Sequence, residues 1–410
     1  MAGEQRPEVV EGGAPPPRRS TRAIAVLVAV ALAGYAIYSV VSDTGSAPQG
    51  APATPHRAPA SGQPAGPVGR GHDSCGTLDL LPVADPRRLD DRPSGRLLVG
   101  GRGLRSLDLE TGRVSQVPGM GANEAVLDLR RGADTTYVLS QAVELCSYRR
   151  TFAYRLHGGR LQRLPGAGTA DALLTGPQGA WLQAFGTDGA YTGLALRPLQ
   201  DGPTLRPHGY PVADTGAGIV VESGGTPDTP RLALLAPDGH KIRDLGRGVV
   251  YGVSHDGRLL VADPDCGRRG SCGLTTRDTA SGRGGPRIFV PHGRSVVSPA
   301  VFGPHGHFVA MLLSRRQDDP RWRAAHPGPP ADVAVLNLDT GDWLTMPDLE
   351  LPPKSQAALA FDGTGEWVLV GVDYGDRTRI FGWHLFAESM GVVADLPGDN
   401  PVSPALLTLP

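Results

Sequence analysis

An excess of charge of either sign is missing from this 410-residue chain. It carries 40 basic and 41 acidic residues, and its formal net charge at pH 7 is −1. A chain without an overall field is not drawn to nucleic acid or to acidic lipid, so we expect no nucleic-acid partner. Lysine is scarce, since Lys241 and Lys354 are the only two, and almost all of the basic charge is therefore arginine.

Motifs that carry chemistry are missing as well. The sequence contains no G-x-S-x-G nucleophile elbow, no H-E-x-x-H zinc motif, no Gly-rich phosphate loop and no EF-hand loop. His305-Gly306-His307 is the nearest approach to a pair of metal ligands, and its surroundings predict a polar turn instead. We expect no catalytic residue, no metal and no cofactor, although a site assembled from distant segments would leave no such motif.

Helical periodicity is missing except in one segment. Residues 23–41, "AIAVLVAVALAGYAIYSVV", contain no charged side chain. At about 1.5 Å per residue a helix of this segment would span the hydrocarbon core of a bilayer. Arg18, Arg19 and Arg22 precede it, so the positive-inside rule places residues 1–22 in the cytoplasm as a tail. We expect a single-pass cell-membrane protein, with everything after residue 41 outside the cytoplasm.

A cleaved signal peptide is the alternative. Its apolar core would be shorter and its cleavage site closer, whereas Ala51-Pro52-Ala53 lies ten residues beyond the apolar segment. We therefore favour an uncleaved anchor. Residues 42–74 are rich in Pro, Ala and Gly and have few large apolar side chains, so we expect a disordered linker before a folded domain of residues 75–410.

The chain has only four cysteines, Cys75, Cys146, Cys266 and Cys272. In an exported domain an even number favours disulfides over metal binding. Cys266 and Cys272 enclose a short polar loop and would pair with each other, which leaves Cys75 to pair with Cys146. A zinc site is disfavoured because His255 is the only histidine near the second pair.

One hairpin pattern recurs through the rest of the sequence. "VLNLDTGDWLTMP" at 335–347 repeats the alternation and the turn of "RSLDLETGRVSQVP" at 105–118. The turn glycines, from Gly112 to Gly391, recur about every 46 residues, close to the ~40–50 residues of a propeller blade. The other five copies span residues 152–166, 194–207, 232–246, 274–291 and 380–398.

Apolar runs between the hairpins predict the inner strands of the same blades. Runs such as "HFVAMLL" and "WVLVGV" are almost continuously apolar, as strands buried on both faces are. The first blade lacks an inner strand before Gly95, and "VSPALLTL" at 402–409 echoes "VSPAVF" at 297–302. We predict an all-β ring of seven four-stranded blades, closed by a C-terminal strand that pairs near Leu406 with the strand near Leu98.

From about residue 95 to residue 410 the chain resembles the WD40, YVTN and TolB-like β-propellers. The resemblance rests on the turns "LDLETG", "LNLDTG", "APDG" and "SHDG". It concerns architecture, because the repeated Gly-His and Trp-Asp pairs of WD40 blades and the tryptophan-docking repeats of quinoprotein dehydrogenases are absent. It implies a fold that mostly binds proteins or small ligands and also hosts enzymes. The Arg, Ala, Gly and Pro bias suggests a GC-rich bacterial genome, and we expect an actinobacterial one.

Long insertions between the second and third strands of the blades are expected on one face of the ring. The insertion around residues 315–332 combines Arg315, Arg321 and Arg323 with Trp322. Tryptophan and arginine often carry the binding energy of interfaces, so we predict these four residues to be partner-binding. The alternative is that Trp322 only packs its own loop against the blade.

Two functions remain open after this reading. We favour a non-catalytic, extracytoplasmic, membrane-tethered propeller that binds an envelope protein or a cell-wall ligand as a scaffold. The alternative is an extracytoplasmic glycan hydrolase or lyase with its site at the mouth of the central channel. A cluster of acidic and His side chains at that mouth would favour the enzyme, and an apolar, Arg-rich surface would favour binding.

The predicted topology can be measured in cells. A reporter enzyme that is active only outside the cytoplasm, fused after Pro410, should be active, because the anchor leaves the C-terminus outside. N-terminal sequencing of the mature protein should start before residue 23. A start near Thr54 would show a cleaved leader while leaving export intact.

Overall fold

The computed structural model describes only part of the chain, and all of that part lies within Asp73–Pro410. The described residues contain β-strands and no helix, so none of their segments is a helix that is long and apolar enough to cross a membrane. The predicted anchor lies outside them. The described residues are 89, 91–132, 134–143, 150–165, 168, 170, 172–177, 179–186, 193–199, 202, 204–223, 230–263, 272–315, 331–351, 357–374, 376–387, 389–398 and 404–409.

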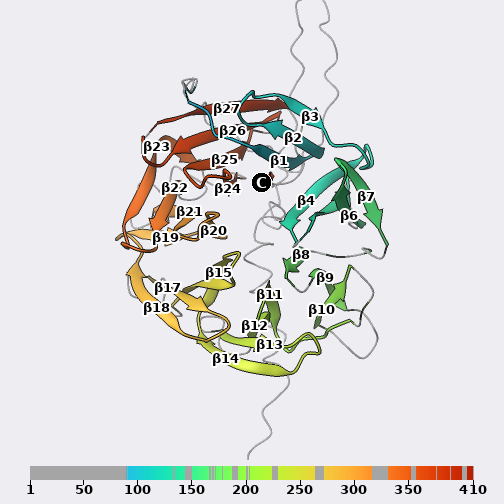
Figure 1. The fold of residues 1–410 in the computed structure, drawn as a ribbon, viewed down its shortest axis with the longest axis vertical. Helices are drawn as coiled ribbons and strands as arrows, with labels where there is room; N and C mark the ends of the chain where they lie inside the picture. Colours follow the sequence, from blue (N-terminus) through green and yellow to red (C-terminus); the bar gives the residue numbers. More distant parts are fainter. Residues whose placement is uncertain are drawn as a thin grey trace, which may run out of the picture. The chain divides into compact units, whose positions relative to one another are not determined.

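The strands form seven antiparallel sheets arranged as blades of a ring, which confirms the predicted seven-bladed β-propeller (Figure 1). In blades 2 to 7 the strands follow one another in chain order from the inside of the ring to the outside. In blade 1 the C-terminal strand takes the innermost place. Blade 1 is β28 (Ala405–Leu409), β1 (Arg96–Gly101), β2 (Gly103–Asp108) and β3 (Val114–Gln116); blade 2 is β4 (Glu124–Arg131), β5 (Thr136–Ala142), β6 (Thr151–His157) and β7 (Arg160–Leu164); blade 3 is β8 (Ala172–Gly176), β9 (Gly179–Gly186) and β10 (Gly193–Pro198).

The remaining four blades complete the ring. Blade 4 is β11 (Tyr210–Thr215), β12 (Gly218–Ser223), β13 (Arg231–Leu235) and β14 (Lys241–Arg247); blade 5 is β15 (Val249–Val253), β16 (Arg258–Ala262), β17 (Gly273–Asp278) and β18 (Gly284–Phe289); blade 6 is β19 (Arg294–Val296), β20 (Val301–Phe302), β21 (Phe308–Arg315), β22 (Ala331–Asn337) and β23 (Trp343–Leu351); blade 7 is β24 (Ala357–Phe361), β25 (Trp367–Asp373), β26 (Arg377–His384) and β27 (Met390–Pro397).

Apolar cores lie between consecutive blades, and there are seven of them among the described residues. Side chains alternate across a strand, so each strand supplies two of these cores. On β21, Met311 packs toward blade 5 and Leu312 toward blade 7. On β1, Leu97 faces blade 7 and Leu98 faces blade 2. This sandwiching explains why the inner strands are almost continuously apolar.

The repeated hairpin pattern encodes the turns between the two outer strands. In blade 1, Thr111 donates its N–H to Asp108 Oδ1 at 2.8 Å, and Gly112 follows with φ of 69°. In blade 6, Asn337 Oδ1 accepts the N–H of Asp339 at 2.9 Å, and Gly341 has φ of 79°. A side-chain oxygen that replaces a backbone acceptor, followed by a residue with positive φ, reverses the chain in both places.

Two blades depart from the expected four-strand scheme. The hairpin at 194–207 was expected to supply two strands of blade 3, but among the described residues its outer arm is only a bridge between Leu196 and Leu205. Pro207 and Pro198 lack an N–H group and cannot extend such a ladder. In blade 6 the inner strand expected within residues 297–302 forms only as β20, and a second short strand, β19, precedes it, with Pro299 between the two.

The ring is closed by the C-terminal strand, as predicted. Leu98 lies opposite Leu407, and Val99 lies opposite Leu406. β28 also contacts the preceding blade, because the Thr408 hydroxyl donates to the carbonyl of Phe361. One strand thus joins blade 1 to blade 7 and covers the edge of β1.

Deletion of residues 405–409 should therefore abolish the cooperative unfolding transition rather than trim a tail, because it exposes the edge of β1 and opens two apolar cores. The measurement is thermal unfolding followed by circular dichroism. As a control, Thr408→Val keeps the strand and should cost only about 1 kcal/mol for its lost hydrogen bond. A deleted protein with an unchanged melting temperature would rule out this closure.

Candidate functional site: an arginine–phenylalanine pocket on blade 2

Of the four residues predicted to bind a partner, the structure describes only Arg315. Arg315 is the last residue of β21 and lies opposite Arg294 of β19. Arg321, Trp322 and Arg323 lie outside the described residues, so their role stays a prediction. Of the four cysteines only Cys272 is described, and it is buried in the core between blades 5 and 6. The pairings with Cys75, Cys146 and Cys266 also stay predictions.

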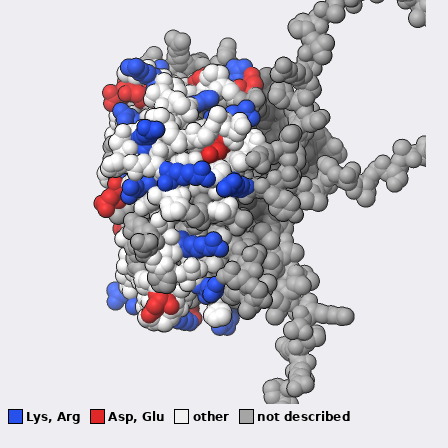
Figure 2. Space-filling view, turned by 90° about the vertical axis from the view of Figure 1, so that its right-hand side faces the viewer, with Lys and Arg blue, Asp and Glu red and all other residues white. Residues whose placement is uncertain are grey.

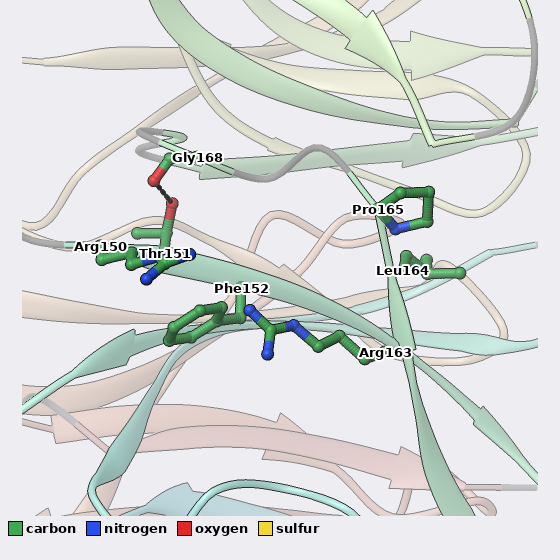
Figure 3. A pocket seen from close by; sticks show the side chains of 7 residues that line it. All are labelled: Arg150, Thr151, Phe152, Arg163, Leu164, Pro165 and Gly168. Atoms are coloured by element: carbon green, nitrogen blue, oxygen red, sulfur yellow. Dashed lines mark hydrogen bonds between the residues drawn. The ribbon is translucent and has the colours of Figure 1, made fainter.

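A cavity of about 250 Å³ lies at the outer part of blade 2. Its lining comes from the start of β6, the end of β7 and the segment that follows β7 (Figure 3). We name it the blade-2 pocket and define it by Arg150, Thr151, Phe152, Arg163, Leu164, Pro165 and Gly168.

A two-residue turn sets the register that builds this pocket. Gly158 and Gly159 connect β6 to β7 with φ of 57° and 75°, values that favour glycine and match the twist of a hairpin. The resulting register places Arg163 opposite Tyr154, next to Phe152 on the same side of the sheet. Phe152 is half-buried against the core between blades 1 and 2, so its ring is fixed.

Two guanidinium groups stack on the ring of Phe152. The Cζ atom of Arg163 lies 4.1 Å from the ring centroid, and that of Arg150 lies 5.6 Å from it. Contacts of this kind contribute about 0.5–1 kcal/mol each at exposed sites. Stacking restrains the flexible arginine side chains while leaving their N–H edges available for hydrogen bonds.

The main chain forms the opposite wall. Thr151 is buried and binds the carbonyl of Gly168 twice, through its N–H at 3.0 Å and through its hydroxyl at 3.1 Å (Figure 3). These bonds fold the segment after β7 back over the start of β6. They also engage Thr151, which carries the only hydroxyl among the described lining residues, so these residues offer cations and apolar walls.

Charge in this part of the chain is one-sided. From Arg150 to Gly168 the sequence has four arginines and no Asp or Glu. Neither Arg150 nor Arg163 forms an ion pair with a described acidic residue. Figure 2, a view from the side of the ring that carries β6 and β7, shows basic side chains spread over that side, in its middle as well as at its rim, with most acidic ones toward the rim.

Arginines stacked on aromatic rings in other blades are neutralised. In blade 5, Arg287 lies 4.9 Å from the ring of Phe289 and forms an ion pair with Asp263. In blade 7, Arg379 lies 5.7 Å from the ring of Tyr374 and pairs with Asp395 at 2.9 Å. Among the described residues, blade 2 has the same stacking without the carboxylate, which makes its arginines candidates for binding an external anion.

Buried carboxylates are the groups that could serve a glycan-cleaving enzyme. Those of Glu124 and Asp214 instead accept hydrogen bonds from side chains within or between blades. Glu124 accepts hydrogen bonds from Ser140 at 2.5 Å and from Tyr154 at 2.9 Å, and burial with the nearby carboxylate raises the pKa of Tyr154 to about 12. Asp214 is 4% exposed and accepts the Trp181 Nε1–H at 2.9 Å. Among the described residues, no three His, Cys, Asp or Glu side chains lie close enough to hold a metal.

The histidine pair of the sequence lies in the turn between β20 and β21, as predicted. Gly306 has φ of 71° there, and His307 Nδ1 is 2.6 Å from Asp339 Oδ2 across to the turn after β22. Both of these side chains are exposed, at 60% and 64%. This contact joins two turns of blade 6.

Sequence reasoning missed the blade-2 pocket. The available signal was the run from 150 to 168, which contains arginine and no acid in a chain that is otherwise balanced. The register of the hairpin and the return of Gly168 to Thr151 could not be derived from that run.

Comparison with known proteins finds similar solved structures at low sequence identity. No protein-family model and no curated protein matches the chain. TolB from Acinetobacter baumannii aligns over 76% of this chain and 66% of its own, at 16% identity and a TM-score of 0.42. Hydrazine synthase from Kuenenia stuttgartiensis aligns over 67% and 86%, at 14% identity and 0.48. A 6-phosphogluconolactonase-like protein from Bacteroides uniformis aligns over 76% and 99%, at 12% identity and 0.47. The sheet topology of the described residues, rather than these likenesses, shows that the chain is a β-propeller.

Asp214 gives a pH-dependent prediction. Burial raises its pKa from 3.8 to about 6, so between these values the folded state holds a proton that the unfolded chain has released. Its contribution to stability is therefore present below pH 4 and is lost as the pH rises through 6, by at most about 3 kcal/mol. Asp214→Asn keeps an oxygen for Trp181 and cannot ionise. Urea unfolding of both proteins at several pH values should show the Asn variant gaining relative stability from pH 4 to pH 7, and a constant difference would contradict this assignment.

Proposed function

We propose that this protein is a membrane-tethered binding scaffold at the cell envelope, and that its blade-2 pocket binds an acidic group of its partner. The observation that carries the proposal is the pair Arg150 and Arg163, both stacked on Phe152 and both without a described acidic counterpart. The tether is the predicted helix at 23–41, and the propeller would lie outside the cytoplasm.

The chemistry of the pocket supports an acidic group. A guanidinium can bind a carboxylate or a phosphate through two parallel N–H bonds, and such charged hydrogen bonds contribute about 1.5–3 kcal/mol each. The stacking on Phe152 restrains both cations before binding, which lowers the entropy cost. A cavity of about 250 Å³ is smaller than the usual site for a whole small molecule, so it fits one acidic side chain or end group better.

The alternative of a glycan hydrolase or lyase has less support. That chemistry needs two carboxylates that face one substrate-sized space. Glu124 and Asp214 instead accept hydrogen bonds from neighbouring side chains inside or between the blades. We therefore propose binding rather than catalysis.

Photo-crosslinking in cells tests this proposal. A photoreactive amino acid in place of Leu164, in the pocket wall, should crosslink a partner in the wild-type background. Arg163→Glu should reduce that crosslink at least tenfold, because it reverses the charge that holds the acidic group. Arg160→Glu is the matched control, since Arg160 is exposed on the same strand but does not line the pocket. Melting temperatures of all variants should agree to within the small shift expected from losing one stacking contact of about 0.5–1 kcal/mol, and equal crosslinking by both glutamate variants would refute the pocket as the binding site.

A further inference from the structure

The outer edge of β7 is a second feature of the same pocket. The two-residue turn makes His157 and Arg160 a hydrogen-bonded pair, and hydrogen-bonded pairs alternate along an antiparallel ladder. Gln162 and Leu164 therefore direct their main-chain N–H and C=O groups toward β6. The residues between them, Leu161 and Arg163, direct theirs outward.

The first outward position confirms this geometry. The N–H of Leu161 donates to the carbonyl of Pro118 at 2.8 Å, so the link between blades 1 and 2 occupies that part of the edge. The approach is close, since a Cβ added at Gly119 would lie 2.2 Å from the carbonyl oxygen of Leu161. β7 is thus already paired outward at one residue.

The second outward position, at Arg163, has no partner among the described residues. No described residue bonds to the outward main-chain groups of Arg163, and the next outward residue is Pro165, which has no N–H. The position at Arg163 lies directly beside the cavity, because the side chain of Arg163 forms one of its walls. Among the described residues, a short stretch of unpaired strand edge therefore adjoins two guanidinium groups that form no ion pair.

We infer that the blade-2 pocket takes an extended acidic peptide segment, which pairs with the edge of β7 at Arg163 and places a carboxylate on Arg150 and Arg163. This inference rests on the proposed function and names its ligand. Charge complementarity selects an acidic segment, since residues 150–168 contain four arginines and no Asp or Glu. The free edge selects a peptide over a phosphate polymer, because strand addition uses main-chain hydrogen bonds that only a peptide offers.

The apolar part of the pocket agrees with a strand-like ligand. In an extended peptide, side chains on one face recur every second residue, about 6.6–6.8 Å apart. One such side chain can place its carboxylate at the arginines while the next rests on Leu164 and Pro165. A small acid or a phosphate would satisfy the cations and leave these apolar walls uncovered.

Synthetic peptides can test the inference with the full-length protein in detergent micelles. The probe is a fluorescent seven-residue peptide of alternating Thr and Val with one central Glu, and binding is read by fluorescence anisotropy. Replacing the central Glu by Gln should weaken binding at least tenfold. On the protein side, Arg163→Ala should have a similar effect, and Arg160→Ala should change the affinity less than twofold.

Backbone methylation distinguishes strand pairing from simple charge recognition. Two further peptides carry N-methyl groups on the odd or on the even positions, and in an extended ligand only one of these sets faces β7. We expect one set to weaken binding at least tenfold and the other to have a small effect. This contrast is internal, because both peptides have the same charge and a similar loss of flexibility.

The other outcomes separate the two claims. Equal binding by both methylated peptides, with dependence on the Glu and on Arg163, would overturn strand pairing and leave acid binding intact. Binding of phosphatidylglycerol vesicles or inorganic phosphate through Arg163, with no peptide bound, would overturn the peptide as ligand. Absence of any Arg163-dependent binding, together with unchanged crosslinking by Arg163→Glu, would overturn the proposed function as well.

Discussion

The packing of each blade against both of its neighbours is the interaction on which the rest of this structure depends. A single sheet of this size cannot bury both of its faces alone, and here the two faces of β1 contribute Leu97 to one interface and Leu98 to the other. The fold is therefore stable only as a complete circle. An open circle would leave the apolar faces of blades 1 and 7 in water, which is why the pairing of Leu98 with Leu407 matters more than an ordinary terminal strand would.

The same close packing dictates what polar groups at the interfaces must do. Glycines such as Gly176 and Gly252 let inner strands of adjacent blades approach, since a Cβ added at either would lie within 2.4 Å of a neighbouring carbonyl oxygen. Where two blades approach this closely, a buried carboxylate needs a hydrogen-bond donor from the neighbouring blade. Glu222 accepts the N–H of Val250 at 2.8 Å from the next blade, and burial raises its pKa, so the acid acts as a link between blades.

Local chemistry decides how much of this could be predicted. The turns could be predicted, because Asp108 and Asn337 are each followed by a glycine at the position that requires positive φ. The closure of the ring could also be predicted, because blade 1 lacked an inner strand and the C-terminal segment matched the pattern of one. The bridge at Leu196 and the pocket on blade 2 could not be predicted. The first depends on which backbone donors the prolines remove, and the second depends on a fold-back of Gly168 onto Thr151 that no periodicity encodes.

Edge strands carry the last constraint, since a closed ring still leaves the outermost strand of each blade with one open side. The edges are blunted in different ways: β3 is only three residues long, β14 has two register shifts, and the carbonyl of Phe289 at the end of β18 accepts the indole N–H of Trp343. The edge of β7 is covered at Leu161, and no described residue pairs with it at Arg163. The arginines there repel a second copy of the same strand, because like charges would meet, and they attract an acidic one. The charge that protects this edge from self-association would then also select its ligand.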